Sequence, residues 1–291
     1  MVAAGEFKRR VSTWNIETKK ELADFDTVLE FGGSRLAISR DGHFCAAGAY
    51  DGGSLAENRY VGGSVSVYDT STGEMLWQNK GIKRVQRLMF SMHFPGMLYA
   101  AFSDQPLNVI DSRTGSVVER IRDTRGIWES PYEEIQLRES GRGDLLYNSS
   151  TGKRIGQLTD CRLGPLDVAF SDVYVVASYV GGPVNCCNTE DGIQVWRHDP
   201  QEGHHYVEIT YNEESHEFVG VDLDFAKGTD TSIFWLDENT GVVRRKLRLT
   251  GTPWETEFAL RGKILITSDG VLLDTCSGKE VARLDFPREV D

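Results

Sequence analysis

The densest group of metal-ligand side chains lies in one short segment, His198-Asp-Pro-Gln-Glu-Gly-His-His205, which holds three of the six histidines. Imidazole and carboxylate groups are ligands that transition metals such as zinc and nickel accept. A polar connection between two strands has the same composition, and we favour that interpretation. We therefore predict no metal site, and calorimetry with zinc or nickel tests this prediction, because heat on titration would indicate one.

Two pairs of carboxylates, Glu133-Glu134 and Glu213-Glu214, are the other candidates for chemistry. Paired acids can act as general acid and base, but no nucleophile with an adjacent base accompanies them. The glycine pairs, such as Gly62-Gly63, precede strand patterns rather than helices, so they are not phosphate-binding loops. The sequence therefore predicts a non-catalytic protein with no catalytic residue, no cofactor and no metal.

The elements that position these residues are hairpins, and the clearest hairpin is Ser64–Gln78. Valines 65 and 67 alternate with serines, which is the period of a half-buried strand. Residues 69–73 then form a turn, because a short acidic side chain can accept backbone N–H groups and glycine tolerates positive φ. Met75 and Trp77 resume the alternation in the second strand.

Variants of this turn recur along the chain. Their first and last residues are Asp111 and Gly115, Asn148 and Gly152, Asn188 and Gly192, Asp237 and Gly241, and Asp274 and Gly278, with a degenerate first copy from Asn15 to Lys19. They are spaced by about 37 to 54 residues, and repeats of this length built from short strands are typical of β-propeller blades. Tryptophans 14, 77, 196 and 235 flank these turns, where we expect them to pack between blades.

The stretch from Leu36 to Tyr50 followed by Ser64–Gln78 resembles one complete four-stranded blade of the WD-repeat or quinoprotein-like propellers. The Trp-Asp dipeptide is absent, and Tyr68-Asp69 and Leu236-Asp237 are among the pairs in its place. The resemblance therefore implies a diverged propeller, and it places a structural histidine at His205. Cys186-Cys187 resembles the cysteine pair of some quinoprotein dehydrogenases, but it immediately precedes the Asn188 turn and is better interpreted as part of a strand.

The predicted fold is all-β, a single propeller domain over residues 1–291. The expected four-stranded blades are 35–79, 84–122, 127–159, 164–198, 204–249 and 254–286, and residues 1–34 form an N-terminal partial blade with strands Arg10–Asn15 and Glu21–Phe25. We predict seven blades in total. Six blades with an N-terminal annex, or a shortened chain, are the alternatives.

The composition narrows the classes of partner. The formal net charge is −12, which disfavours nucleic acid and would attract a basic protein. No apolar run is long enough to span a bilayer, and residues 1–10 lack a secretory signal, so we expect a cytoplasmic monomer. The five cysteines are odd in number and mostly within strands, which indicates reduced, buried thiols.

Loop lengths indicate the working face. The connections between second and third strands, and those between blades, vary in length, whereas the repeated turn does not. Tolerated insertion at exposed tips is the alternative explanation. Tyr, Trp and Arg residues dominate interface energetics. We therefore predict a partner-binding rim formed by Tyr50, Asp51, Glu57, Arg59, Tyr60, Asp104, Trp128, Tyr132, Tyr179, His204, His205, Asp224, Lys227 and Trp254.

The predicted function is recognition of a protein partner through this rim. One specific form is an acidic inhibitor or immunity-type protein that binds a basic effector or toxin, because complementary charge speeds association. The alternative is a propeller enzyme, either a quinoprotein-like dehydrogenase or a metal-dependent hydrolase that uses the central channel. Carboxylates converging on that channel around an ion would favour the enzyme, and a channel closed by apolar residues would favour the binding protein.

Overall fold

The computed structural model describes most of the chain as short strands joined by turns. The described residues are 2–7, 10–15, 18, 20–26, 35–50, 63–103, 105–141, 143–158, 164–179, 181–201, 204–224, 230–250, 256–259, 263–267 and 270–284. They form two compact units, Met1–Glu129 and Ser130–Asp291. Within these ranges no helix is long and apolar enough to cross a membrane.

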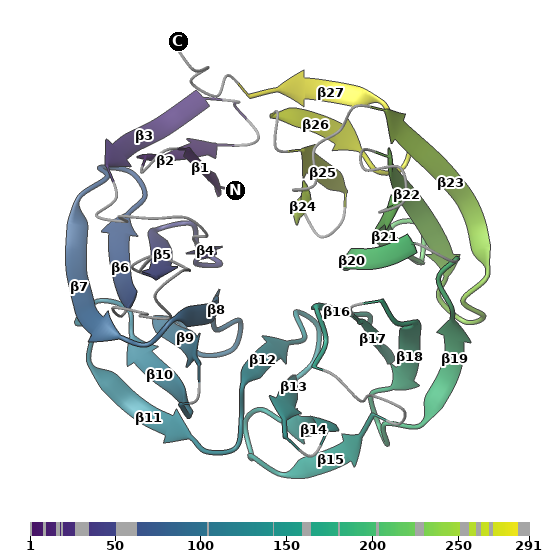
Figure 1. Ribbon diagram of the computed structural model, residues 1–291, viewed down its shortest axis with the longest axis horizontal. Coiled ribbons are helices and arrows are strands. Elements are labelled where there is room, and N and C mark those ends of the chain that lie inside the picture. The colour runs from purple at the N-terminus through teal and green to yellow at the C-terminus, as the bar shows by residue number, and fades with distance from the viewer. Residues whose placement is uncertain are drawn as a thin grey trace, which may run out of the picture. The chain divides into compact units, whose positions relative to one another are not determined.

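The first unit contains one three-stranded sheet and two four-stranded blades (Figure 1). The three-stranded sheet has the order β1-β2-β3, and each blade follows the chain order. The strands are β1 (Val2–Phe7), β2 (Arg10–Asn15), β3 (Lys20–Asp26), β4 (Arg35–Ile38), β5 (Phe44–Tyr50), β6 (Gly63–Asp69), β7 (Met75–Ile82), β8 (Val85–Phe90), β9 (Met97–Phe102), β10 (Leu107–Asp111), β11 (Val117–Ile121) and β12 (Gly126–Glu129). We call β4–β7 blade 1 and β8–β11 blade 2.

The second unit repeats the same meander. Its strands are β13 (Ile135–Ser140), β14 (Gly143–Asn148), β15 (Arg154–Gln157), β16 (Asp167–Phe170), β17 (Tyr174–Ser178), β18 (Val184–Asn188), β19 (Gln194–His198), β20 (His204–Asn212), β21 (Glu217–Asp224), β22 (Asp230–Asp237), β23 (Val243–Thr250), β24 (Thr256–Ala259), β25 (Ile264–Thr267), β26 (Val271–Asp274) and β27 (Glu280–Arg283). Blade 3 has the strand order β12-β13-β14-β15, blade 4 is β16–β19, blade 5 is β20–β23 and blade 6 is β24–β27.

The predicted all-β architecture of four-stranded antiparallel blades is confirmed, but the predicted number of seven blades is wrong. The described chain has six four-stranded blades. The N-terminal residues form a sheet of three strands, because β1 pairs antiparallel with β2 in addition to the two strands predicted there. That sheet is one strand short of a complete blade.

The repeated turn has the predicted chemistry at each described copy. In blade 5, Asp237 Oδ1 accepts hydrogen bonds from the N–H groups of Asn239 and Thr240 at 3.1 and 2.9 Å. The last turn glycine has a positive φ in all six blades, +66° at Gly241 for example. The degenerate copy keeps part of this pattern, since Thr18 N donates to Asn15 Oδ1 at 3.0 Å. Each turn is therefore closed by interactions within its own five residues.

The turns also join neighbouring blades. The ring of Trp196 in the outer strand of blade 4 packs on Gly241 in the turn of blade 5, where an added Cβ would lie 2.5 Å from Cε3. The indole N–H of Trp196 donates to the carbonyl oxygen of Glu238 at 2.8 Å. In the first unit Trp77 packs in the same way on Gly115, so two of the four tryptophans predicted to lie between blades form an inter-blade contact.

The hydrophobic core lies between successive blades. Among the described residues, one large cluster joins Val176, Cys186 and Trp196 of blade 4 to Tyr211 and Phe234 of blade 5. The partly buried residues Tyr132, Tyr174 and Val243 pack against it. Figure 1 shows, within the second unit, the sheets of blades 4 and 5 side by side. The edge of this junction carries the candidate site.

Candidate functional site

The predicted rim residues fall into three groups in the structure. Residues Asp51, Glu57, Arg59, Tyr60, Asp104, Lys227 and Trp254 lie outside the described residues. Tyr50 ends β5 and Asp224 ends β21. The remaining five predicted residues have described side chains: Tyr179, His204 and His205 belong to blades 4 and 5, and Trp128 and Tyr132 belong to blade 3.

Tyr179, His204 and His205 lie together at the edge of blades 4 and 5 that carries the connections between second and third strands. A Cβ on Gly181 would lie 3.1 Å from Cε1 of His205, so this connection of blade 4 touches the start of β20. His204 pairs in register with Asp224. The side chain of Tyr179 is buried, and its hydroxyl donates to Asp144 Oδ2 at 3.1 Å. This edge is where the prediction placed these residues.

Trp128 and Tyr132, which were predicted for the rim, do not lie in the connection between blades 2 and 3. That connection ends at Arg125, because Gly126–Glu129 already forms β12. Trp128 is buried in this strand, with the guanidinium of Arg87 at 4.1 Å from its ring centroid. Tyr132 lies in the turn between β12 and β13, which belongs to the opposite edge. The assignment of both residues to that connection was wrong.

The three imidazoles of the 198–205 segment enter separate environments. The ring of His198 stacks at 6.5 Å on Phe234, and burial lowers its pKa. His204 Nδ1 lies 2.9 Å from Asp222 Oδ2, which also accepts a hydrogen bond from Lys246 Nζ at 2.7 Å. In the described ranges no three histidine, cysteine, aspartate or glutamate side chains form a group that could hold a metal.

Buried and half-buried carboxylates join neighbouring strands and blades. Glu129 accepts hydrogen bonds from the hydroxyls of Ser91 and Tyr99 at 2.8 and 2.9 Å, which joins β12 to blade 2. Asp167 of blade 4 accepts from the backbone N–H of Ile209 in blade 5 at 3.0 Å. Burying a carboxylate is tolerated where such donors compensate its lost hydration. These carboxylates have scaffold partners.

Three of the four described cysteines are buried within strands. Cys186 and Cys187 are buried in β18, and burial raises the pKa of the Cys186 thiol. Adjacent strand residues point to opposite faces of a sheet, so the two thiols fill two separate packing sites. Cys45 is also buried, whereas Cys276 is exposed in the last repeated turn. The strand interpretation of the cysteine pair fits this placement.

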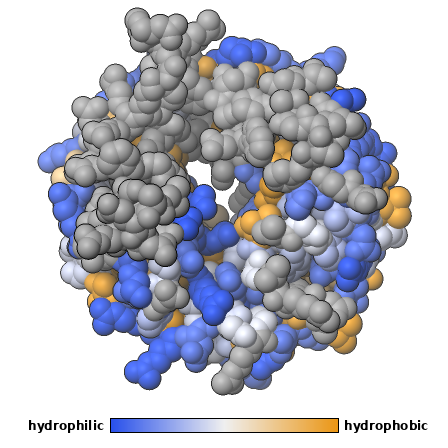
Figure 2. All heavy atoms as spheres, in the orientation of Figure 1, coloured by the Kyte–Doolittle hydropathy of each residue, from blue (hydrophilic) through white to orange (hydrophobic). Residues whose placement is uncertain are grey.

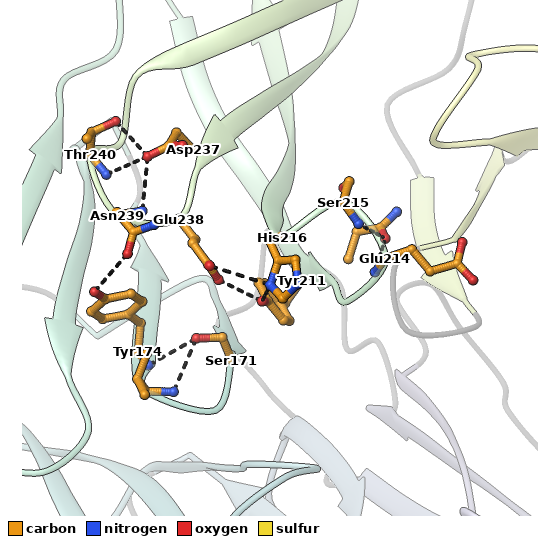
Figure 3. A network of polar contacts seen from close by, with 12 residues as sticks. Ser171, Tyr174, Tyr211, Glu214, Ser215, His216, Asp237, Glu238, Asn239 and Thr240 are labelled. Atoms are coloured by element: carbon orange, nitrogen blue, oxygen red, sulfur yellow. Dashed lines mark hydrogen bonds and ion pairs between the residues drawn. The ribbon is translucent and has the colours of Figure 1, made fainter.

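A network of polar and aromatic side chains occupies the turn edge of blades 4 and 5 (Figure 3). The hydroxyl of Tyr211 donates to Glu238 Oε2 at 2.6 Å, and Nδ1 of His216 lies 3.1 Å from the same hydroxyl. Burial, followed by the hydrogen bond to Glu238, raises the pKa of Tyr211. The hydroxyl of Tyr174 in blade 4 donates to Asn239 Oδ1 in blade 5 at 3.1 Å. The turn of blade 5 is thereby held against blade 4.

Three exposed aliphatic side chains lie in turns of blades 4 and 5 at this edge. Val173, Ile193 and Val242 are 50%, 63% and 61% exposed, and we call these three residues the junction patch. Val173 and Ile193 end the two turns of blade 4, which are joined by a hydrogen bond of 3.0 Å from Thr189 N to the carbonyl oxygen of Val173. Val242 follows Gly241, on which Trp196 of blade 4 packs.

The junction patch departs from the rest of the repeat. The residue equivalent to Ile193 and Val242 is polar in the four other blades, namely Glu74, Ser116, Lys153 and Lys279. The residue equivalent to Val173 in the other blades is His43, Gly96, Glu134, His216 or Lys263. In Figure 2 the described surface on the visible face is mostly hydrophilic, with apolar residues in separate groups. The turn itself therefore does not require aliphatic side chains at these positions.

Sequence reasoning missed the junction patch and Tyr174 and Tyr211. Considered one at a time, Ile193 and Val242 are ordinary residues directly before an outer strand. Aligning the six turns would have shown them as the two apolar exceptions. The contact between Trp196 and the next turn, which places Val242 beside blade 4, has no signal in the sequence.

Comparison with known proteins identifies the fold and no family. No protein-family model and no curated protein matches the chain. Among solved structures, it is similar to the dihydro-heme d1 dehydrogenase NirN in complex with DHE, with a TM-score of 0.59 and 17% identity over 94% of this chain. The chain spans 61% of the NirN chain.

Two further structures agree on the architecture. A chain of the mitotic checkpoint complex gives a TM-score of 0.70 at 14% identity, covering 91% of this chain and 80% of that one. The computationally designed Ika8 protein gives 0.54 at 15% identity, covering 91% of each chain. These likenesses, with the strand order above, define a β-propeller. Membership of the WD-repeat or quinoprotein-like families stays a prediction.

Proposed function

We propose that this chain is a non-catalytic propeller that binds a protein partner, and that the junction patch of blades 4 and 5 is its contact surface. The observation that carries the proposal is the placement of exposed aliphatic side chains at turn positions that are polar or glycine in the other blades. Exposed apolar groups gathered in one place are typical of interaction sites, whereas isolated ones are ordinary.

The surroundings of the patch support this assignment. Tyr132 and Tyr211 meet edge to face, with ring centroids 6.0 Å apart, and Tyr174 reaches across to blade 5. Tyrosine is enriched in interfaces because one side chain offers apolar area and a hydrogen-bonding group. The bonds of Trp196 and Tyr174 to residues 238 and 239 fix the turn before any partner binds, which lowers the entropic cost of association.

The experiment is affinity capture from the organism that supplies the chain. The wild-type protein should retain a partner that the double variant Ile193→Lys/Val242→Lys loses. Val118→Lys is the matched control, because Val118 is also 61% exposed but lies in the outer strand of blade 2. A partner retained equally by the double variant would contradict this site.

The same capture tests the rim predicted from loop lengths. Tyr60→Ala and Arg59→Ala lie in the longest connection between second and third strands. We expect these variants to retain the partner. Loss with Tyr60→Ala alone, with the junction variant unaffected, would move the contact surface to that rim.

The net charge of −12 favours a basic partner, because opposite charge raises the rate of encounter. A basic effector or toxin inhibited by this chain would be one member of that class. Capture of a partner with net negative charge would contradict the proposal that the partner is basic.

A further inference from the structure

The junction patch is bordered by carboxylates. Asp172 directly precedes Val173, and Glu190 and Asp191 lie in the repeated turn that Ile193 ends. All three are exposed, and none has an ion-pair partner among the described residues. Glu238 adds a fourth carboxylate, fixed by the hydroxyl of Tyr211 at 2.6 Å.

The cations on the neighbouring outer strand are engaged in the scaffold. The guanidinium of Arg244 pairs with the carboxylate of Asp237. That of Arg245 lies 3.9 Å from the centroid of the Trp235 ring and donates to the carbonyl oxygen of Thr275 at 3.0 Å. His216 is exposed beside Glu238 and is the one titratable base of the network.

On the other side, the turn with Glu190 and Asp191 packs on β15 of blade 3, since a Cβ on Gly156 would collide with the carbonyl oxygen of Asp191. Lys153 and Arg154 are exposed cations at the start of that strand, and Arg154 donates to Gln157 Oε1 at 2.9 Å. The four carboxylates outnumber these two cations, so the local charge at the patch is negative.

We propose that the occupant of the junction patch is a basic segment of a partner protein. Its apolar side chains would pack on Val173, Ile193 and Val242, and its lysine or arginine side chains would face Asp172, Glu190 and Asp191. This inference rests on the proposed function and names the chemistry of the partner. An acidic or uncharged apolar segment would leave these carboxylates without a counter-charge at the edge of a desolvated contact.

We expect the carboxylates and the aliphatic residues of the patch to contribute to partner binding in different ways. Burying the aliphatic side chains provides affinity that depends little on salt. Exposed charges around a contact act on the association rate and on the salt dependence. Removing the methyl groups should therefore raise Kd at every salt concentration. Removing the charges should mainly slow association and flatten the response to salt.

The test uses the full chain and three synthetic peptides of equal length, with alternating leucine and lysine, leucine and glutamate, or serine and lysine. Binding is measured by fluorescence anisotropy at low and high salt. Two variants separate the contributions: Ile193→Thr/Val242→Thr keeps the charge, and Asp172→Asn/Glu190→Gln/Asp191→Asn keeps the aliphatic groups. Val118→Thr/Val281→Thr is the control, because both valines are exposed in outer strands of other blades.

The leucine–lysine peptide should bind the wild type saturably and at least about tenfold more tightly than either other peptide. The threonine double variant should lose about tenfold in affinity at both salt concentrations, which corresponds to about 1.4 kcal/mol. The amide triple variant should slow association about tenfold at low salt, and the control should match the wild type.

Three results would overturn the inference: no saturable binding of the leucine–lysine peptide, equal binding of the leucine–glutamate peptide, or an unaltered Kd in the threonine double variant. Failure of the proposed function is recognised separately. If the partner captured from the source organism is retained by Ile193→Lys/Val242→Lys, the patch is not the contact surface. If that variant loses the partner but the peptides show no charge preference, the patch remains the contact surface, and the proposal that its occupant is a basic segment is wrong.

Discussion

Replacement of Gly241 by alanine tests whether the inter-blade contact that builds the junction is as tight as the structure indicates. Two costs add at this position. An alanine at φ +66° pays about 1–2 kcal/mol for the left-handed backbone. Its Cβ would also lie 2.5 Å from Cε3 of Trp196, and such overpacking costs about 1–3 kcal/mol. We therefore expect Gly241→Ala to destabilise the chain by about 2–5 kcal/mol.

Gly152 provides the matched control. It ends the same turn in blade 3 with a φ of +67°, but an added Cβ there has no heavy atom of the described structure within 4 Å. Gly152→Ala should therefore cost only the backbone share, about 1–2 kcal/mol. The assay is urea unfolding followed by circular dichroism, with free energies extrapolated to water.

A double-mutant cycle isolates the steric share. In a Trp196→Ala background the indole ring is gone, so Gly241→Ala should cost no more than Gly152→Ala does in the wild type. The two substitutions would then be less than additive by about 1–3 kcal/mol. Additivity within about 0.5 kcal/mol, or equal costs for the two glycines, would refute the inter-blade contact.

Three further outcomes follow from the site geometry. Hydrogen bonds from the side chain of Ser71, the backbone N–H of Thr114 and the side chain of Thr240 hold the pKa values of Asp69, Asp111 and Asp237 below their usual range. The stability that these ionised carboxylates add is therefore complete above the unfolded pKa of about 3.9, and it is lost as the pH falls through the folded pKa values. In an acid titration, the triple variant Asp69→Asn/Asp111→Asn/Asp237→Asn should lose less stability than the wild type between about pH 4 and 2. The same loss of stability in both proteins would contradict this. Among the described cysteines, Cys276 should react with a thiol reagent much faster than Cys45, Cys186 or Cys187, because it alone is exposed. Mass spectrometry after brief labelling measures this, and modification of Cys186 would contradict it. Asp222→Ala should destabilise the chain by about 3–5 kcal/mol in the same urea assay, since it removes a buried carboxylate between His204 and Lys246; a loss below about 1 kcal/mol would show that this group is not part of the scaffold.

The repeated turns could be predicted from the sequence because their chemistry is local. An aspartate or asparagine that accepts N–H groups ahead of it, and a glycine at positive φ, are visible in five consecutive letters. The fold class followed from the spacing of these turns. The missing strand in the N-terminal prediction has an equally local cause, because Val2–Phe7 contains alanines and a glycine instead of an alternating apolar pattern.

The candidate site could be predicted only in part, because it depends on contacts between blades. The prediction placed Trp128 and Tyr132 on the rim, but Trp128 is buried within β12 and Tyr132 lies in the turn that follows, at the opposite edge. The junction patch is defined by two turns of blade 4 and one of blade 5, and Trp196 and Tyr174 hold the turn of blade 5 against blade 4. Only the folded chain shows which exposed side chains share that edge.

Photo-crosslinking tests the central claim most directly. A photoreactive phenylalanine placed at position 242, in a surface position that the wild type already exposes, should form a covalent adduct with the partner in extracts of the source organism. The same residue placed at position 118, which is equally exposed, should form none. Adducts at position 118 but not at 242, or equal adducts at both, would contradict a protein-binding surface at the junction of blades 4 and 5.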